Sequence, residues 1–164
     1  MKLTLTGLAL IAAVALAACG GSSNDGNAAA STGSTTVSLD GSQLVDSHGA
    51  PLYSTEQEKG GTIACTGGCT SIWLPLAAPG SGQPTAGDGV SGKLGTIKRP
   101  DGARQVTLDG RPLYRFAQDG SSGKATGDGV TDSFGGRQFK WHAETDSGTS
   151  NSSGGGGGGN NYSY

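Results

Sequence analysis

Polar and apolar residues alternate with a period of two in the middle of this chain. The alternation runs through residues 104–108 and resumes over residues 112–116. Asp109-Gly110, between them, is typical of a two-residue hairpin turn, so we predict a β-hairpin. Residues 94–99 and 138–142 are further strand candidates. No stretch of ten residues has helical periodicity, and 32 glycines disfavour helices, so the pattern predicts an all-β fold.

A short motif occurs twice, 61 residues apart. Residues 49–53 read Gly-Ala-Pro-Leu-Tyr and residues 110–114 read Gly-Arg-Pro-Leu-Tyr. Each copy later reaches a tryptophan, Trp73 or Trp141, and we expect the four rings of Tyr53, Tyr114, Trp73 and Trp141 to anchor a thin core. In the first copy Ser47-His48-Gly49 stands where the turn is expected, which predicts a longer or less regular hairpin.

These patterns define a small antiparallel β domain over residues 37–145. We expect it to consist of two related halves of about sixty residues each, at about residues 42–80 and 94–143. On either side the chain is rich in Gly, Ser and Asn, which predicts a flexible tether over residues 19–36 and a disordered tail over residues 146–164.

The first eighteen residues have the features of an export signal. Lys2 precedes an apolar run from Leu8 to Ala18, which is shorter than the roughly twenty residues that span a bilayer. The segment Leu16-Ala17-Ala18-Cys19 resembles the lipobox of bacterial lipoproteins. That resemblance implies lipidation of Cys19 and anchoring in membrane lipid on the extracytoplasmic side of the cell membrane or outer membrane. Ordinary secretion, with Cys19 an incidental thiol, is the alternative.

The charge of the mature chain argues against nucleic acid as a partner. Without Lys2, ten Lys and Arg residues face thirteen Asp and Glu residues, a net charge of about -3.

Cys65 and Cys69 enclose Thr66-Gly67-Gly68. The two glycines permit a tight turn, and disulfides persist outside the cytoplasm, so a disulfide is the first interpretation. The alternative is a redox pair or a copper or zinc site, in which His48 or His142 joins the two thiolates as metal ligands.

Neither catalysis nor calcium binding has a recognisable motif here. The chain contains no Gly-x-Ser-x-Gly, no His-Glu-x-x-His and no phosphate-binding loop, so we assign no catalytic residue and no cofactor. Asp119, Asp128 and Asp132 lie in a turn-rich segment but lack the spacing of a calcium loop. Asx-turns account for the same residues.

The residues Tyr114, Phe116 and Asp119 form the pattern Tyr-x-(Phe/Trp/Tyr)-x-x-Asp. Together with residues 65–75 and 94–102, this pattern resembles the secreted-repeat bacterial lipoproteins of unknown function. The resemblance covers about residues 42–143 and implies tandem copies of one unit, without implying an activity. The first copy has Thr55 and Glu58 at the positions of the second aromatic and the acid, so we expect only the second copy to be a complete site.

Two functional hypotheses remain. The first is a non-enzymatic, membrane-anchored module that binds an envelope ligand or protein or has a structural role, with ligand contacts at Tyr114, Phe116, Asp119 and Trp141. The second is envelope redox chemistry or copper or zinc handling through Cys65 and Cys69.

Overall fold

The computed structural model describes residues 34–120, 123–146, 148–149 and 161–163. The predicted signal, the lipidation site Cys19 and nearly all of the predicted tether lie outside the described residues. In the part of the chain that is described, no helix is long and apolar enough to cross a membrane.

The predicted all-β fold is confirmed. The first half of the domain contains four strands and two short helical turns: β1 (Thr36–Asp40), β2 (Gln43–Asp46), β3 (Tyr53–Thr55), η1 (Glu56–Glu58), α1 (Cys69–Ile72) and β4 (Trp73–Pro75). The second half follows a connection that carries the two-residue strand β5 (Thr85–Ala86). Its strands are β6 (Leu94–Lys98), β7 (Arg104–Leu108), β8 (Arg111–Pro112), β9 (Tyr114–Phe116), β10 (Thr131–Phe134) and β11 (Arg137–Thr145).

The hairpin between β7 and β8 has the predicted two-residue turn. Leu108 pairs with Arg111, and both Asp109 and Gly110 have positive φ angles of 49° and 81°, as a type I′ turn requires. In the first half the corresponding bridge joins Val45 to Pro51 and leaves five residues in the loop. The Asp46 carboxylate accepts backbone hydrogen bonds within this loop, so the prediction of a longer first hairpin is confirmed.

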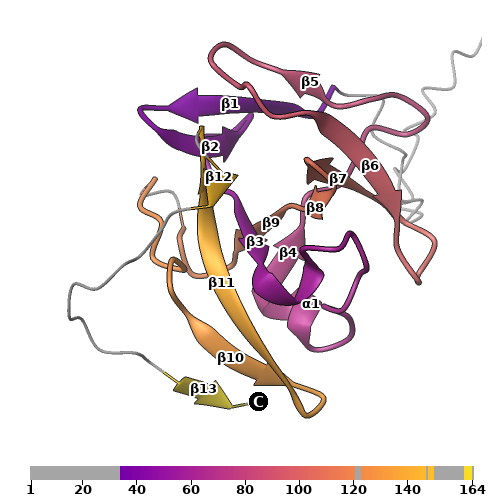
Figure 1. The fold of residues 1–164 in the computed structure, drawn as a ribbon, viewed down its shortest axis with the longest axis vertical. Helices are drawn as coiled ribbons and strands as arrows, with labels where there is room; N and C mark the ends of the chain where they lie inside the picture. Colours follow the sequence, from indigo (N-terminus) through magenta and orange to yellow (C-terminus); the bar gives the residue numbers. More distant parts are fainter. Residues whose placement is uncertain (1–33, 121–122, 147, 150–160, 164) are drawn as a thin grey trace, which may run out of the picture.

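The two halves exchange their last strands. In the central sheet the order is β4-β9-β3-β11, so β4 of the first half pairs with β9 of the second, and β11 of the second half pairs with β3 of the first. β3 and β9 meet in the middle, where Tyr53 pairs with Tyr114. Figure 1 shows these four strands at the centre, with β1, β2 and β5 at one end and β10 and β13 at the other.

The exchange continues beyond the central sheet with matching contacts. Leu76 donates its backbone N–H to the carbonyl of Leu113 (2.9 Å), and Glu144 donates to Leu52 (2.8 Å). Further along, Ala77 bridges to Gln105 and Thr145 pairs with Gln43. The contacts on one side of the Tyr53–Tyr114 pair therefore correspond to those on the other, as expected for two related halves.

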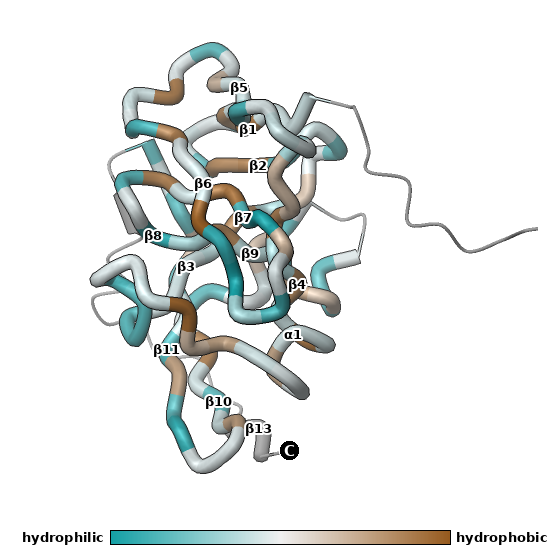
Figure 2. Tube along the Cα trace, turned by 90° about the vertical axis from the view of Figure 1, so that its right-hand side faces the viewer, coloured by the Kyte–Doolittle hydropathy of each residue, from teal (hydrophilic) through white to brown (hydrophobic). Residues whose placement is uncertain are grey.

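The core has two parts. One part is aromatic and includes both tryptophans and the disulfide, while the other is aliphatic and is built on Leu44, Leu52, Val106 and Leu113. Hydrophobic and hydrophilic stretches are interspersed along the whole tube in Figure 2, as in strands that bury alternate side chains.

Within the predicted disordered tail, two short pieces pair with the domain. β12 (Gly148–Thr149) pairs antiparallel with β11, and β13 (Asn161–Ser163) pairs parallel with β10. The sheets are therefore mixed rather than purely antiparallel. The remainder of the tail, from residue 150 to residue 160 and at residues 147 and 164, lies outside the described part.

Candidate functional site

The tyrosines of the repeated motif lie at the centre of the molecule and bind across the halves. The hydroxyl of Tyr53 donates a hydrogen bond to Oδ2 of Asp119 (2.6 Å), and the hydroxyl of Tyr114 donates to Oε2 of Glu58 (2.8 Å). Glu58 and Asp119 occupy the same position in the two copies, 61 residues apart. Each tyrosine therefore uses the carboxylate of the other half.

Each of these carboxylates also holds the loop that follows it in its own half. Glu58 accepts hydrogen bonds from the backbone of Ala64 and Cys65. Asp119 accepts them from the backbone N–H (2.9 Å) and hydroxyl (2.6 Å) of Thr126. Because both carboxylates are buried, these donors replace the water that they lose on folding.

Burial and the neighbouring carboxylates keep both phenols protonated. Desolvation is the largest effect and raises the pKa of Tyr53 and of Tyr114 far above the usual value for a phenol. The acidic partner, Asp119 or Glu58, raises the pKa further. Neutral phenols that donate to carboxylates are therefore the stable arrangement at neutral pH.

Four aromatic rings stack beside the tyrosines. Trp73 and Trp141 lie parallel, with centroids 3.9 Å apart and planes at 9°. Phe116 stacks on the outer side of Trp73 at 4.4 Å. Phe139 stacks on Trp141 at 6.0 Å. Thr55, at the position equivalent to Phe116, is the cross-strand partner of Trp141 and supplies no ring.

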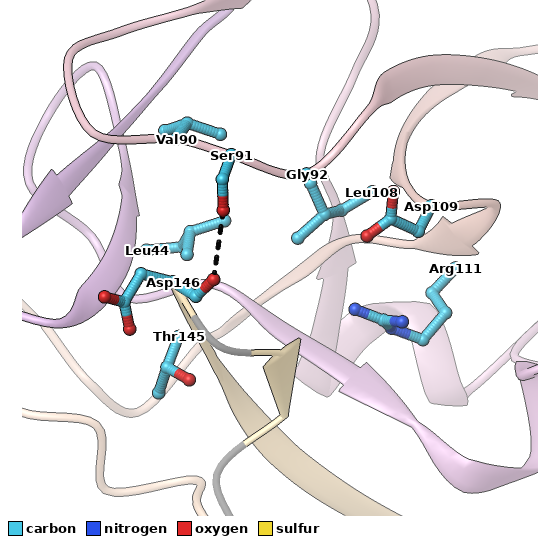
Figure 3. A pocket seen from close by; sticks show the side chains of 9 residues that line it. All are labelled: Leu44, Val90, Ser91, Gly92, Leu108, Asp109, Arg111, Thr145 and Asp146. Carbon is cyan, nitrogen blue, oxygen red and sulfur yellow. Dashed lines mark hydrogen bonds between the residues drawn. The ribbon is translucent and has the colours of Figure 1, made fainter.

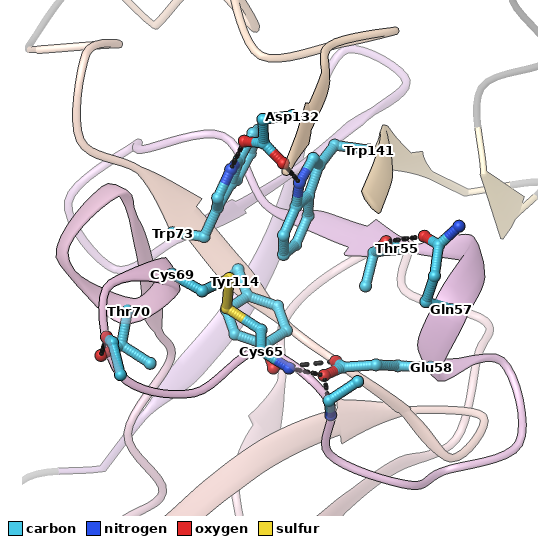
Figure 4. The surroundings of a disulfide bond; sticks show 12 residues. Thr55, Gln57, Glu58, Cys65, Cys69, Thr70, Trp73, Tyr114, Asp132 and Trp141 are labelled. Carbon is cyan, nitrogen blue, oxygen red and sulfur yellow. Dashed lines mark hydrogen bonds between the residues drawn. A yellow bond between two sulfur atoms is a disulfide. The ribbon is translucent and has the colours of Figure 1, made fainter. Parts of the chain in front are cut away.

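Asp132 joins the two tryptophans through its carboxylate. The indole N–H of Trp73 donates to Oδ2 (2.6 Å) and that of Trp141 donates to Oδ1 (3.0 Å), as Figure 4 shows. Burial raises the pKa of Asp132, while the two indole hydrogen bonds oppose this shift. Asp132 therefore links a tryptophan of each half. Both of its carboxylate oxygens, which the sequence offers as possible calcium ligands, bind indole N–H groups instead.

Cys65 and Cys69 form the predicted disulfide, and both residues are fully buried. Cys65 precedes a turn in which Gly67 has a φ of 58°, and Cys69 begins α1, so the two cysteines are not on one helix. Figure 4 shows the bond beside Tyr114. Thiolate ligands for copper or zinc are not available in this state, and no cluster of three or more metal-binding side chains exists among the described residues.

The two histidines contact acidic side chains instead of the disulfide. The His48 side chain is 81% exposed and lies 3.8 Å from the Asp46 carboxylate. His142 is nearly buried on β11, where its Nε2 lies 2.9 Å from Oε1 of Glu56. This hydrogen bond is the main reason that the pKa of Glu56 is lowered.

Arg99 is a buried cation that the sequence alone did not single out. Its guanidinium donates to the carbonyl of Cys65 (2.7 Å), to the side chain of Gln105 and, more weakly, to the Tyr114 hydroxyl (3.4 Å). An ion pair with Asp101 (3.4 Å) balances its charge. Arg99 therefore connects the disulfide loop of the first half to β7 and β9 of the second.

Several cavities indent the described surface. One of about 340 Å³ lies between β2, the connection at Val90 and the β7–β8 hairpin (Figure 3). Its cation, Arg111, makes a two-point contact with the buried Glu144 carboxylate (3.0 Å and 3.0 Å), which raises the pKa of Arg111. Another of about 520 Å³ is lined by Ile63, Phe134 and Arg137, among others.

Comparison with known proteins supports the family resemblance over the second half. Residues 95–143 match the model of a family described as a secreted repeat of unknown function. This segment is similar to a secreted repeat. The match runs from β6 to β11 and includes Tyr114, Asp119, Asp132 and Trp141, whereas the first half lies outside it. Comparisons with curated proteins and with solved structures found no match.

The motif residues that we expect to contact a ligand lie in the interior of the domain. Tyr114 and Trp141 are fully buried, and Phe116 and Asp119 are 7% and 6% exposed. Their aromatic rings and hydrogen-bonding groups are engaged in the core, because they complete contacts between the halves. A ligand that approached from solvent would meet other residues.

Glu58 and Asp132 are the central residues that sequence reasoning missed. Glu58 departs from the motif in residue type, yet its carboxylate does what Asp119 does, and the offset of 61 residues is the signal for it. The sequence places Asp132 in a turn-rich segment, but no motif and no equivalent in the first copy indicates that it binds the two tryptophans.

Proposed function

We propose that this chain is a lipid-anchored, non-enzymatic module of the cell envelope. The Leu-Ala-Ala-Cys segment that ends in Cys19 supports the anchor, and the secreted-repeat match and the disulfide are in keeping with a compartment outside the cytoplasm. A diacylated cysteine would hold the folded domain at the membrane surface on a tether of Gly, Ser, Asn and Ala.

The observation that carries the non-enzymatic part is the occupation of the buried acids. Glu58, Asp119 and Asp132 are the carboxylates that bind the central tyrosines and tryptophans, and each accepts at least two hydrogen bonds from the protein. General acids and bases need a reacting group within hydrogen-bonding reach. Here that reach is taken up by tyrosines, indoles and loop backbone, which favours a scaffold whose exterior makes the contacts.

Metabolic labelling with a clickable palmitate analogue tests the anchor. We expect the wild-type chain to take up the label and to enter the detergent phase, and the Cys19→Ser variant to do neither. The matched control removes the other two cysteines, Cys65→Ala with Cys69→Ala, and should keep the label. An unlabelled wild-type chain, or a Cys19→Ser variant that is still labelled, would contradict the proposal.

Site-specific photo-crosslinking in cells tests where the module makes contacts. A photoreactive residue is placed at the exposed position His48, between β2 and β3, or at the exposed position Arg137, at the start of β11. We expect an adduct with an envelope component from one of these positions and not from the other. A matched probe at buried Leu113 should give no adduct. Equal adducts at all three positions would contradict a specific contact surface.

A further inference from the structure

β6 is an edge strand of the three-stranded sheet. The strand order is β6-β7-β8, and Figure 1 shows β6 on the outer side of β7. Two backbone hydrogen bonds flank the pair of strands: Asp109 donates to Lys93 (2.8 Å), and Arg99 donates to Ala103 (2.9 Å). Because backbone groups alternate in direction along a strand, the odd-numbered residues of β6 also face β7, and the even-numbered residues face outwards.

The outward groups of β6 form a free edge. They are the backbone N–H and C=O groups of Leu94, Thr96 and Lys98, and no other described strand pairs with them. A row of this kind is a template for an added strand, and several recognition domains bind extended peptides in this way. A lysine on an edge discourages indiscriminate pairing, so Lys98 favours a strand that places an acid opposite it.

A groove of two adjoining cavities runs beside the end of β6. The first cavity, of about 390 Å³, lies between Ile97 and the loop that contains Ile63. The second, of about 520 Å³, continues from Ile63 and Pro100 to Phe134 and Arg137. Both volumes are in the size range of small ligand sites, and apolar side chains from three separate segments line them.

The charged side chains of this groove are cationic. Lys98 lines the first cavity and Arg137 lines the second, and both residues are exposed. Neither forms an ion pair with a described residue, whereas the buried Arg99 is paired with Asp101. The described residues that line the two cavities include no acid. The groove therefore has a positive potential, which favours an anionic ligand.

We propose that the outward edge of β6 and the groove beside it bind an extended acidic peptide of another envelope protein. The peptide adds to β6 as a strand, and its backbone pairs with the outward N–H and C=O groups. Cross-strand partners share a face of the sheet, so the peptide residue opposite Ile97 lies over the first cavity and is apolar. Acidic residues on either side of it pair with Lys98 and Arg137.

This inference rests on the proposed function, because it names the part of the exterior at which the module makes contact. Of the two positions chosen for photo-crosslinking, Arg137 lies in the groove, so the adduct is expected there. The peptide is tested on a mature chain with Cys19→Ser, which carries no lipid. A failure of peptide binding is therefore distinguishable from a failure of the lipid anchor, which the palmitate label reports separately.

Selection from a random peptide library displayed on phage identifies the preferred ligand. We expect the immobilised chain to enrich peptides in which an apolar residue lies between acidic residues. A synthetic peptide of the enriched sequence is then titrated into the chain, and backbone amide NMR signals should shift most along β6. Enrichment of basic peptides, no enrichment at all, or shifts confined to another surface would overturn the proposal.

The role of the strand edge is tested by removing one outward N–H. Edge strands tolerate proline where the N–H faces solvent, so Thr96→Pro removes this donor. Thr96→Val is the matched control, because it keeps the N–H and also loses the hydroxyl that binds Arg104. We expect Thr96→Pro to weaken the synthetic peptide about tenfold relative to Thr96→Val.

A modified peptide makes the same test without altering the protein, in case Thr96→Pro does not fold. Methylation of the peptide amides that face β6 should also weaken binding about tenfold, whereas methylation of the amides that face solvent should not. Equal affinity for the two methylated peptides would overturn the proposal.

Charge reversal tests the choice of an acidic ligand. Lys98→Glu and Arg137→Glu should each weaken the synthetic peptide roughly threefold or more. Lys124→Glu changes the net charge by the same amount at an exposed residue that does not line the groove, and it should leave the affinity nearly unchanged. Equal effects of all three substitutions would show that only the net charge of the chain matters, and they would overturn the proposal.

Discussion

Replacement of Tyr53 by Phe removes one hydroxyl from the centre of the domain. The ring keeps its shape, so no cavity forms, and the edge-to-face contact with Trp73 at 5.4 Å is retained. Two hydrogen bonds are lost: the 2.6 Å bond that the hydroxyl donates to the Asp119 carboxylate, and the 3.3 Å bond that it accepts from the backbone N–H of Gly127. Both join the first half to the second, so the effect on stability reports hydrogen bonds across the halves.

The expected loss follows from the environment of Asp119. A hydrogen bond to a charged group contributes about 1.5–3 kcal/mol, and more is lost when the acceptor becomes an orphan. Asp119 keeps two donors from Thr126, so it does not become an orphan. We expect Tyr53→Phe to lower the free energy of unfolding by about 1.5–2 kcal/mol, measured by urea denaturation with tryptophan fluorescence.

Double-mutant cycles establish which carboxylate is the partner. Tyr53→Phe with Asp119→Asn should show a coupling energy of about 1 kcal/mol or more, since the two groups are in direct contact. Tyr53→Phe with Glu58→Gln should be additive, because Glu58 binds the other tyrosine, Tyr114. Coupling of Tyr53 to Glu58 instead of Asp119 would refute the exchange between the halves, and so would additivity in both cycles.

Three further predictions concern the titratable groups and the disulfide. Burial raises the pKa of Asp132 in the folded chain. Its contribution to stability is therefore full below the unfolded-state pKa of about 4, and it is lost as the pH rises through the higher folded-state pKa. Urea denaturation at a series of pH values should show the wild type losing stability relative to Asp132→Asn across this pH range. The pKa values of Tyr53 and Tyr114 are raised in the folded chain. Absorbance at 295 nm should therefore show that neither ionises near pH 10 while the chain is folded, and the free energy of unfolding should fall above that pH. Ionisation of both at pH 10 without unfolding would contradict their burial. Replacing Cys65 and Cys69 together by Ala should cost about 2 kcal/mol, because the loop that they close is short, and a change near zero in the urea midpoint would show that the loop is held by other contacts.

Local patterns predicted the strands and turns well. Asp109-Gly110 forms the two-residue turn, and the five-residue loop at 46–50 follows from the absence of such a dipeptide. The disulfide followed from Gly67-Gly68, which allows the chain to reverse between Cys65 and Cys69. These features depend on the conformational preferences of a few neighbouring residues, and such preferences are visible in a sequence.

The pairing between halves was not visible in the same way. A period of two says that a residue lies on a strand, and a repeat says that two segments are alike, but neither says whether β4 pairs within its own half or across to β9. The tyrosine motif alone therefore suggests a contact surface, whereas in the structure each buried tyrosine hydroxyl binds an acid of the other copy. The offset of 61 residues aligns Glu58 with Asp119, and this alignment is the sequence signal that both copies have such an acid.

Cleavage of the connection in the folded protein tests the interlocked halves most directly. A specific protease site inserted after Gln83 lies in an exposed part of the connection, away from the tyrosine and tryptophan contacts. After cleavage, we predict that the two fragments elute together, keep the near-ultraviolet circular dichroism of the stacked tryptophans, and separate only in denaturant, with a midpoint that now depends on protein concentration. Fragments that separate in native buffer, with loss of the tryptophan signal, would contradict the account.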